Sequence, residues 1–282
     1  MRLQRLNKWF RRVIFLFAGI FAAYIALCFY MAEEVLSPKR VLPPRPQELV
    51  ELEINNAPAW ASPSVKSGKA KTVFIFSHGL MAQQDFFAKV AIQVAKKGFG
   101  VVLPPMPGQG YSPLQRVGFG LTESEVIQQT IDKIKADKII LVGCSMGGAA
   151  TWLASKHPRV SAVITEGAYG RLDPVTRYWF ERKTPGGSIL FRPVIWIASW
   201  KMGMNPANVN PVETAAKFTK PALVIQCEKD GLIPREQAEE LAKVSNADYW
   251  LIPGKKHAQG QEVGDEYIRR LIQVAEKVSE KA

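Results

Sequence analysis

The sequence contains few of the residues that bind metals or form disulfides, with only three histidines and three cysteines among its 282 residues. Cys28 lies in an apolar run, Cys144 in a glycine-containing turn and Cys227 in a strand-like stretch, a distribution that indicates no disulfide framework. No group of Cys and His has the spacing of metal ligands, so we expect neither a structural nor a catalytic zinc site. The scarcity of histidine limits the candidates for a general base to His78, His157 and His257.

Dense basic runs and internal repeats are also missing, although the formal net charge is +12. Five of the cations precede residue 13, and no run of Lys or Arg in the chain is longer than two. A nucleic-acid-binding domain gathers its cations in one patch or stripe, so we predict no nucleic-acid partner. A hydrophobic content of 47% and a length of 282 residues favour one large folded domain with an appendage.

One long apolar run is present near the start of the chain. Residues 13–32 carry no charge, and as a helix rising about 1.5 Å per residue these residues would cross a hydrocarbon core about 30 Å thick. A cleaved signal peptide is the alternative, but its apolar region usually has about 7 to 15 residues and ends in a small-x-small site. We therefore predict an uncleaved transmembrane signal-anchor helix over residues 13–32.

The residues flanking this run predict its orientation. The basic tail, residues 1–12, holds five Lys or Arg, whereas only Lys39, Arg40 and Arg45 follow the helix closely. Positively charged flanks tend to stay in the cytoplasm, so the folded domain is expected outside it, in a periplasm or lumen. Residues 33–48 contain several prolines and are interpreted as a stiff linker, which leaves residues 49–282 for the folded domain.

The folded domain alternates short apolar runs with longer amphipathic ones, which predicts a mostly parallel sheet covered by helices, an α/β fold. The expected strands are residues 49–54, 73–77, 101–103, 138–142, 160–165, 222–227 and 249–252, and the expected helices are residues 83–97, 123–136, 146–156, 234–245 and 265–278.

A glycine-flanked serine stands between one of these strands and a helix. Gly143-Cys144-Ser145-Met146-Gly147 follows the strand at residues 138–142, and the small residues allow the sharp turn that would expose Ser145. The other interpretation, a phosphate-binding turn, lacks both a P-loop lysine and the G-x-G-x-x-G spacing. Ser145 is therefore predicted to be a covalent nucleophile.

A serine hydroxyl needs a base within hydrogen-bond reach and a group that orients that base. His157 is expected at a helix end and His78 in a loop-shaping position, which leaves His257, in the loop after the last strand, as the general base. For the orienting acid we favour Asp230, which follows the strand at residues 222–227, over its rivals Glu228 and Asp173. The chain order is then Ser, Asp, His.

The tetrahedral intermediate of acyl transfer needs hydrogen-bond donors where its negative charge develops. The amide of Met146, directly after the nucleophile at a helix N-terminus, is the first candidate. The second is the amide of Leu80 in the loop His78-Gly79-Leu80-Met81.

These residues resemble the α/β-hydrolase superfamily, in which a Gly-x-Ser-x-Gly turn, an acid and a histidine follow in this order and a His-Gly loop precedes them. The similarity covers about residues 70–280 and is strongest to esterase, lysophospholipase and acyl-thioesterase branches. It implies a central parallel sheet, a helical cap or lid insert, ester hydrolysis through an acyl-serine intermediate, and no cofactor. A peptidase or amidase uses the same triad, and a non-catalytic binding protein can share the fold, so both remain alternatives.

The insert at residues 167–220 would form the cap that selects the substrate. It is rich in aromatic residues interleaved with cations, a composition that suits a lid over an acyl pocket or a membrane interface, and the aromatics could equally pack the cap onto the core. We hypothesise a small-molecule or lipid acyl ester as the substrate. The aromatic residues are Tyr169, Tyr178, Trp179, Phe180, Phe191, Trp196 and Trp200.

Overall fold

The structure is a computed structural model that describes residues 2–280, with side chains from residue 8 onward. The first residue of the predicted basic tail and the last two of the predicted folded domain lie outside the described residues.

An eight-stranded sheet forms the centre of the molecule, in the order β1-β2-β4-β3-β5-β6-β7-β8. The strands from β4 to β8 pair in parallel, whereas β1 and β2 form an antiparallel hairpin at one edge. The inner strands are continuous apolar runs because helices cover both faces of the sheet. The strands are β1 Val50–Ile54, β2 Ala57–Ala61, β3 Thr72–Ser77, β4 Gly100–Leu103, β5 Lys138–Cys144, β6 Val160–Glu166, β7 Ala222–Lys229 and β8 Asp248–Lys256.

Strand β2 is absent from the sequence prediction. Its residues, Ala57-Pro58-Ala59-Trp60-Ala61, include only one strong strand former. The hairpin turn gives the better signal, because Asn55 and Asn56 both adopt positive φ, 52° and 59°, as a tight two-residue turn requires.

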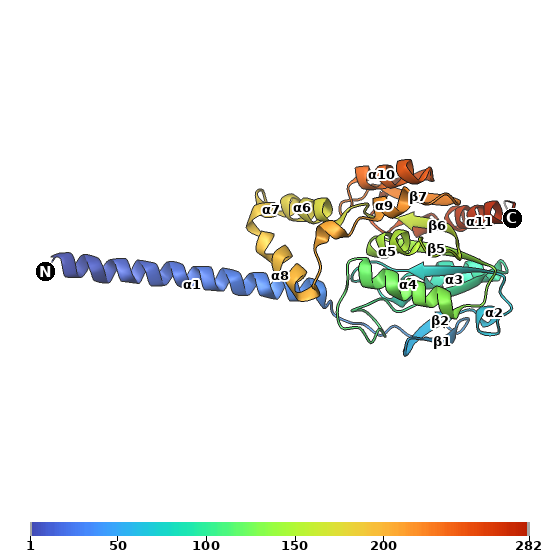
Figure 1. Ribbon diagram of the computed structural model, residues 1–282, viewed down its shortest axis with the longest axis horizontal. Coiled ribbons are helices and arrows are strands. Elements are labelled where there is room, and N and C mark those ends of the chain that lie inside the picture. Colours follow the sequence, from blue (N-terminus) through green and yellow to red (C-terminus); the bar gives the residue numbers. More distant parts are fainter. Residues whose placement is uncertain (1, 281–282) are drawn as a thin grey trace.

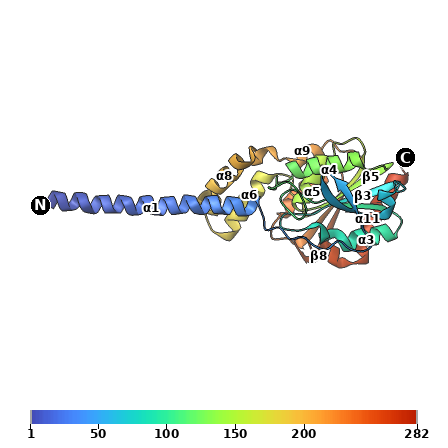
Figure 2. The ribbon, with the colours of Figure 1, turned by 90° about the horizontal axis from the view of Figure 1, so that it is seen from below.

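Helices pack on both faces of the sheet (Figures 1 and 2). One apolar cluster joins α3 and α11 to one face, and another joins α4, α5, α9 and α10 to the opposite face. The helices are α2 Pro63–Lys66, α3 Ala88–Lys96, α4 Leu121–Lys133, α5 Met146–Ala154, α9 Pro211–Ala215, α10 Arg235–Ser245 and α11 Asp265–Glu280, with short 3-10 helices at Gln84–Phe87, Pro206–Asn208 and Gly260–Val263.

Between β6 and β7 the chain builds a helical cap that stands off the sheet (Figure 1). The cap comprises α6 Leu172–Lys183, α7 Gly187–Leu190 and α8 Arg192–Met202. It lies on the side of the domain from which the N-terminal helix projects (Figures 1 and 2).

The N-terminal helix, α1 Arg2–Leu36, is longer than the predicted transmembrane segment at both ends. It begins in the predicted basic tail and continues into the predicted linker, ending before Pro38, where a helical conformation of the preceding residue is disfavoured. Lys8–Leu36 is long and apolar enough to cross a membrane. Large apolar side chains such as Phe10, Phe15 and Phe17 are exposed along its first half.

The second half of α1 packs against the cap. Cys28 and Ala32 are fully buried in a cluster with Val194 of α8. The residues after α1, predicted to be a stiff spacer, instead lie along the domain, since Arg40 donates to Ser112 O at 2.7 Å and Tyr111 donates to Pro43 O at 3.1 Å.

Candidate active site

Ser145 lies in a strained turn between β5 and α5. Its φ of 56° and ψ of −122° are unusual for a non-glycine residue, and Ser145 N donates to Glu166 O at 2.8 Å. Glycine is required on both sides, because a Cβ at Gly143 would collide with the Gly147 backbone and one at Gly147 with the backbone oxygen of Ser77. The turn leaves Ser145 partly exposed while its neighbours are buried.

His257 and Asp230 meet at the same edge of the sheet. Asp230 follows β7 and His257 follows β8, and the carboxyl ends of parallel strands lie together. His257 Nδ1 is 2.7 Å from Asp230 Oδ2, and the Asp230 side chain is 1% exposed. Its other oxygen, Oδ1, accepts from the amides of Leu232 at 2.8 Å and Ile233 at 2.9 Å. The carboxylate is therefore fixed with one oxygen toward the imidazole.

Two glycines show how closely these groups converge. A Cβ at Gly79 would lie 3.0 Å from Ser145 Cβ, and one at Gly167 would lie 3.1 Å from both Asp230 Oδ2 and His257 Cε1. Across residues 8–280, whose side chains are described, no hydrogen bond joins Ser145 Oγ to His257. Such bonds are often long in unliganded enzymes and tighten when substrate binds.

The two predicted oxyanion donors border the serine. Met146 is the first residue of α5, and Leu80 follows Gly79 in the loop against Ser145. Within the described part of the chain, neither the Leu80 amide nor the Met146 amide donates a hydrogen bond. Both amides are thus available to an oxyanion that forms beside Ser145.

The other histidines have partners of their own. His157 Nε2 is 3.0 Å from Asp132 Oδ1 on α4, and it contacts no member of the Ser145 site. His78 is buried with Nδ1 3.0 Å from Gly79 O, and burial lowers its pKa to about 4, so its ring is neutral at pH 7.

The rival acids are engaged elsewhere. Glu228 accepts from the amide of Gly254 at 2.7 Å, and Asp173 pairs with Arg177 at 3.0 Å within α6. Neither forms a hydrogen bond with His257 among the described side chains.

A buried carboxyl that the sequence analysis did not identify lies beneath the histidine loop. Glu166, at the end of β6, is 1% exposed and accepts from Gly260 N at 2.7 Å and Tyr267 Oη at 2.9 Å. Burial raises its pKa above the ordinary value for glutamate. The available signal was a glutamate at the end of the otherwise apolar strand Val160–Glu166, where a charge needs partners.

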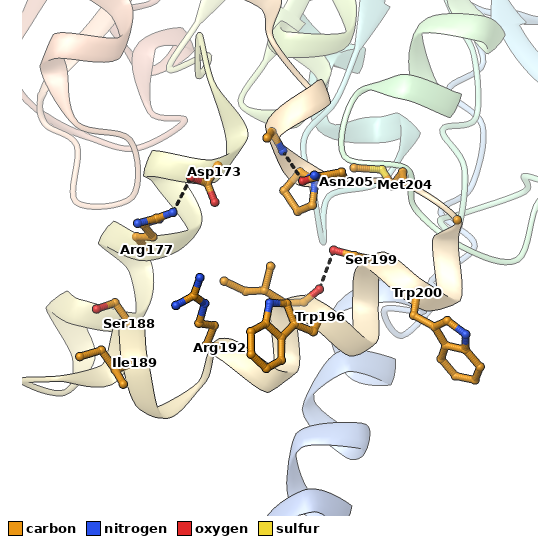
Figure 3. Close-up of a pocket in the computed structure, with 14 residues that line it drawn as sticks. Asp173, Arg177, Ser188, Ile189, Arg192, Trp196, Ser199, Trp200, Met204 and Asn205 are labelled. Carbon is orange, nitrogen blue, oxygen red and sulfur yellow. Dashed lines mark hydrogen bonds and ion pairs between the residues drawn. The ribbon is translucent and has the colours of Figure 1, made fainter.

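The cap contacts the loop that carries Asp230. Trp179 Nε1 on α6 donates to Leu232 O at 2.7 Å, and Arg182 donates to Gly231 O. On its other side the cap has a groove of about 730 Å³ (Figure 3). Arg177, Arg192, Trp196 and Trp200 are among the residues that line this groove, which does not include Ser145.

The sequence is similar to a known family and to a known esterase. Residues 72–191 match the family model of the alpha/beta hydrolase fold. Esterase LipC of Mycobacterium tuberculosis is 31% identical over 147 residues, which cover 45% of this chain and 36% of that protein. The match thus spans about a third of the curated relative.

Solved structures with similar folds include an esterase and a phospholipase. The Pyrococcus furiosus esterase superposes with a TM-score of 0.67 at 17% identity, covering 86% of this chain and 98% of its own. A membrane phospholipase A, described as a bacterial virulence factor, superposes with a TM-score of 0.59 at 16% identity, covering 98% of this chain and 99% of its own. At these identities the similarity concerns the fold.

Proposed function

This chain is a protein of the α/β-hydrolase fold, and on that premise we propose that it is a membrane-anchored serine esterase with Ser145, Asp230 and His257 as its catalytic triad. The observation that carries the proposal is the strained turn at Ser145, facing the same sheet edge as the 2.7 Å pair of His257 and Asp230. The similarity to an esterase in sequence supports an ester substrate.

The residues suggest the steps of the reaction. His257 takes the proton from Ser145 Oγ, which attacks the ester carbonyl carbon, and Asp230 stabilises the resulting imidazolium. The amides of Met146 and Leu80 donate to the oxyanion. When the tetrahedral intermediate collapses, His257 protonates the departing alcohol. His257 then activates a water that attacks the acyl carbon, and the carboxylic acid leaves Ser145.

The substrate we propose has an apolar acyl group and is reached beside a membrane. The support is the long apolar helix α1 and the aromatic side chains of the cap next to it. The same triad would serve a thioesterase, peptidase or amidase. The five cations before residue 13 support an extracytoplasmic location of the folded domain, which protease accessibility of intact spheroplasts tests directly.

A fluorophosphonate probe tests the nucleophile. We expect the full-length protein to be labelled at one serine, and Ser145→Ala to lose the label because the attacking oxygen is gone. Ser67→Ala, which changes an exposed serine after α2, should keep full labelling. A folded wild-type protein that stays unlabelled, or a Ser145→Ala variant that keeps its label, would disprove the mechanism.

A substrate panel tests the bond and the acyl group. We expect hydrolysis of p-nitrophenyl esters and none of peptide amides, with longer acyl chains preferred to acetyl. Equal rates on acetyl and longer esters would contradict the acyl pocket.

Trp179→Phe removes the hydrogen bond from α6 to Leu232 O, which destabilises the conformation of the loop that carries Asp230 by about 1 kcal/mol. We therefore expect kcat to fall about fivefold to tenfold. Phenylalanine keeps an aromatic ring on α6, and KM for a soluble ester should change little. Trp250→Phe is the matched control, because this tryptophan of β8 packs near Arg270 of α11, away from the cap. If both variants have the same kcat, the cap does not position the acid.

A further inference from the structure

We propose that the outer face of the cap is a second membrane contact, which rests in the lipid interface beside α1. We define this cap face by four exposed apolar side chains, Ile189 and Leu190 of α7 and Trp196 and Trp200 of α8, whose exposed fractions are 78%, 48%, 60% and 75%. The inference rests on the proposed anchoring of the chain by α1, and it adds that the cap itself touches lipid.

The anchor has no apolar length to spare. A hydrocarbon core needs about 20 apolar residues, and the charge-free run at residues 13–32 has only twenty, bounded by Arg12 and Glu33. The second half of this run is also the part that packs on the cap, through Tyr24, Cys28 and Ala32. If residues 13–32 span the core, the cap cannot remain outside the lipid.

The two ends of the cap would reach different depths in the membrane. Tyr24 donates to Leu190 O just before α8, and Glu33 pairs with Lys201 near the end of α8, so α8 runs parallel to α1. Tyr24 and Glu33 are nine residues apart, about 14 Å along a helix. With Glu33 at the headgroups, Leu190 lies below an interface that is only about 5–7 Å thick on each side.

The residue types on the cap face change with the expected depth in the membrane. Ile189 and Leu190, at the deeper end, are aliphatic, whereas Trp200, at the shallow end, is a residue type enriched at membrane interfaces. Figure 3 shows Trp196 and Trp200 on either side of α1 and Ile189 at the other end of the groove, while Arg192 turns toward Arg177. The guanidinium of Arg192 is 5.4 Å from the Trp196 ring, which partly compensates its charge.

The charge of the cap favours lipid over a second protein surface of the same kind. Residues 172–202 carry five Lys or Arg and two acids, an excess that suits anionic headgroups. A basic amphipathic surface of this kind, joined to an apolar helix, is typical of interfacial binding.

The test places a fluorophore on the cap face in the full-length protein. The native cysteines Cys28, Cys144 and Cys227 are buried, so an environment-sensitive dye attached to Ile189→Cys or Trp200→Cys reports on one position. Glu276→Cys on α11, at the opposite end of the domain, is the matched control (Figure 1). Each variant is reconstituted into phosphatidylglycerol–phosphatidylethanolamine vesicles that carry a doxyl quencher either shallow or deep on the acyl chain.

We expect a blue shift and loss of fluorescence for both cap positions and neither for Glu276→Cys. Ile189→Cys should respond more to the deep quencher and Trp200→Cys to the shallow one. Cap positions that resemble the control would overturn the proposal. A blue shift without doxyl quenching, dependent on protein concentration, would assign the face to a second copy and overturn it too. The readout works equally in Ser145→Ala, so its outcome is independent of the proposed catalysis.

Discussion

Asp230→Asn is expected to lower kcat about 10⁴-fold while the protein remains folded. The 2.7 Å bond from His257 Nδ1 needs an acceptor at Oδ2, and an amide NH2 at that position would favour the wrong imidazole tautomer. The remaining oxygen of asparagine can still accept from the amides of Leu232 and Ile233, which keeps the loop in place. Initial rates on a soluble p-nitrophenyl ester, with thermal unfolding in the same detergent, measure both effects.

The rival acids provide matched controls for this prediction. Glu228→Gln and Asp173→Asn remove carboxylates that are bound to Gly254 N and Arg177 instead of His257, so each should change kcat by less than about threefold. A loss in either control comparable to that in Asp230→Asn would assign the acid differently.

Much of the sheet could be predicted from local sequence because its inner strands are apolar runs between turn signals. The strand at Lys138–Cys144 and the helix from Met146 are found where the pattern places them. The hairpin strand Ala57–Ala61 could not be predicted in this way, since its pairing partner and not its own residues makes it a strand.

Contacts between distant segments left no local signal. The pairing of α1 with α8 joins residues more than 160 positions apart, as in the contact of Glu33 with Lys201. The hydropathy of residues 13–32 predicts an apolar helix, but it does not distinguish a lipid-facing residue from Cys28, which faces the cap. The same limit applies to the bonds from Trp179 and Arg182 to the loop of Asp230.

The candidate site includes residues that could be predicted from local sequence and one residue that could not. Ser145, Asp230 and His257 each follow a predicted strand, and the rule that parallel strands end at one edge brings them together. Glu166 was missed because its importance depends on Gly260 and Tyr267, about a hundred residues away in sequence. A glutamate at the end of a strand otherwise resembles a surface charge.

Glu166→Leu is expected to lower the free energy of unfolding by about 2–6 kcal/mol, because the Gly260 amide and the Tyr267 hydroxyl would each be left buried without an acceptor. Glu166→Gln should lower it by less, about 1–3 kcal/mol, since its oxygen still accepts from Gly260 N while its NH2 leaves only the Tyr267 hydroxyl without an acceptor. Chemical unfolding in detergent solution measures the difference between the two variants.

The pH dependence of this difference has a definite sign. Burial raises the pKa of Glu166 in the folded protein, so folding retains a proton that the unfolded chain releases above about pH 4.3. The contribution of Glu166 to stability is full below that pH and is lost as the pH rises through the raised pKa. Glu166→Gln does not titrate, and its stability relative to the wild type should therefore increase from pH 4 toward pH 7. A constant or falling difference would show that Glu166 is not held protonated in this way.

A substitution at Glu123 serves as a control, because it distinguishes a loss of stability from a loss of the positioning of His257. It is also buried with a pKa raised by burial, but it accepts from the amides of Gly118 and Gly120 at 2.8 and 2.7 Å, before α4. Glu123→Leu should destabilise the protein by a similar amount and leave kcat of the folded fraction unchanged. Glu166→Leu should lower kcat as well, because Gly260 lies three residues after His257 and its bond to Glu166 anchors that loop to the sheet.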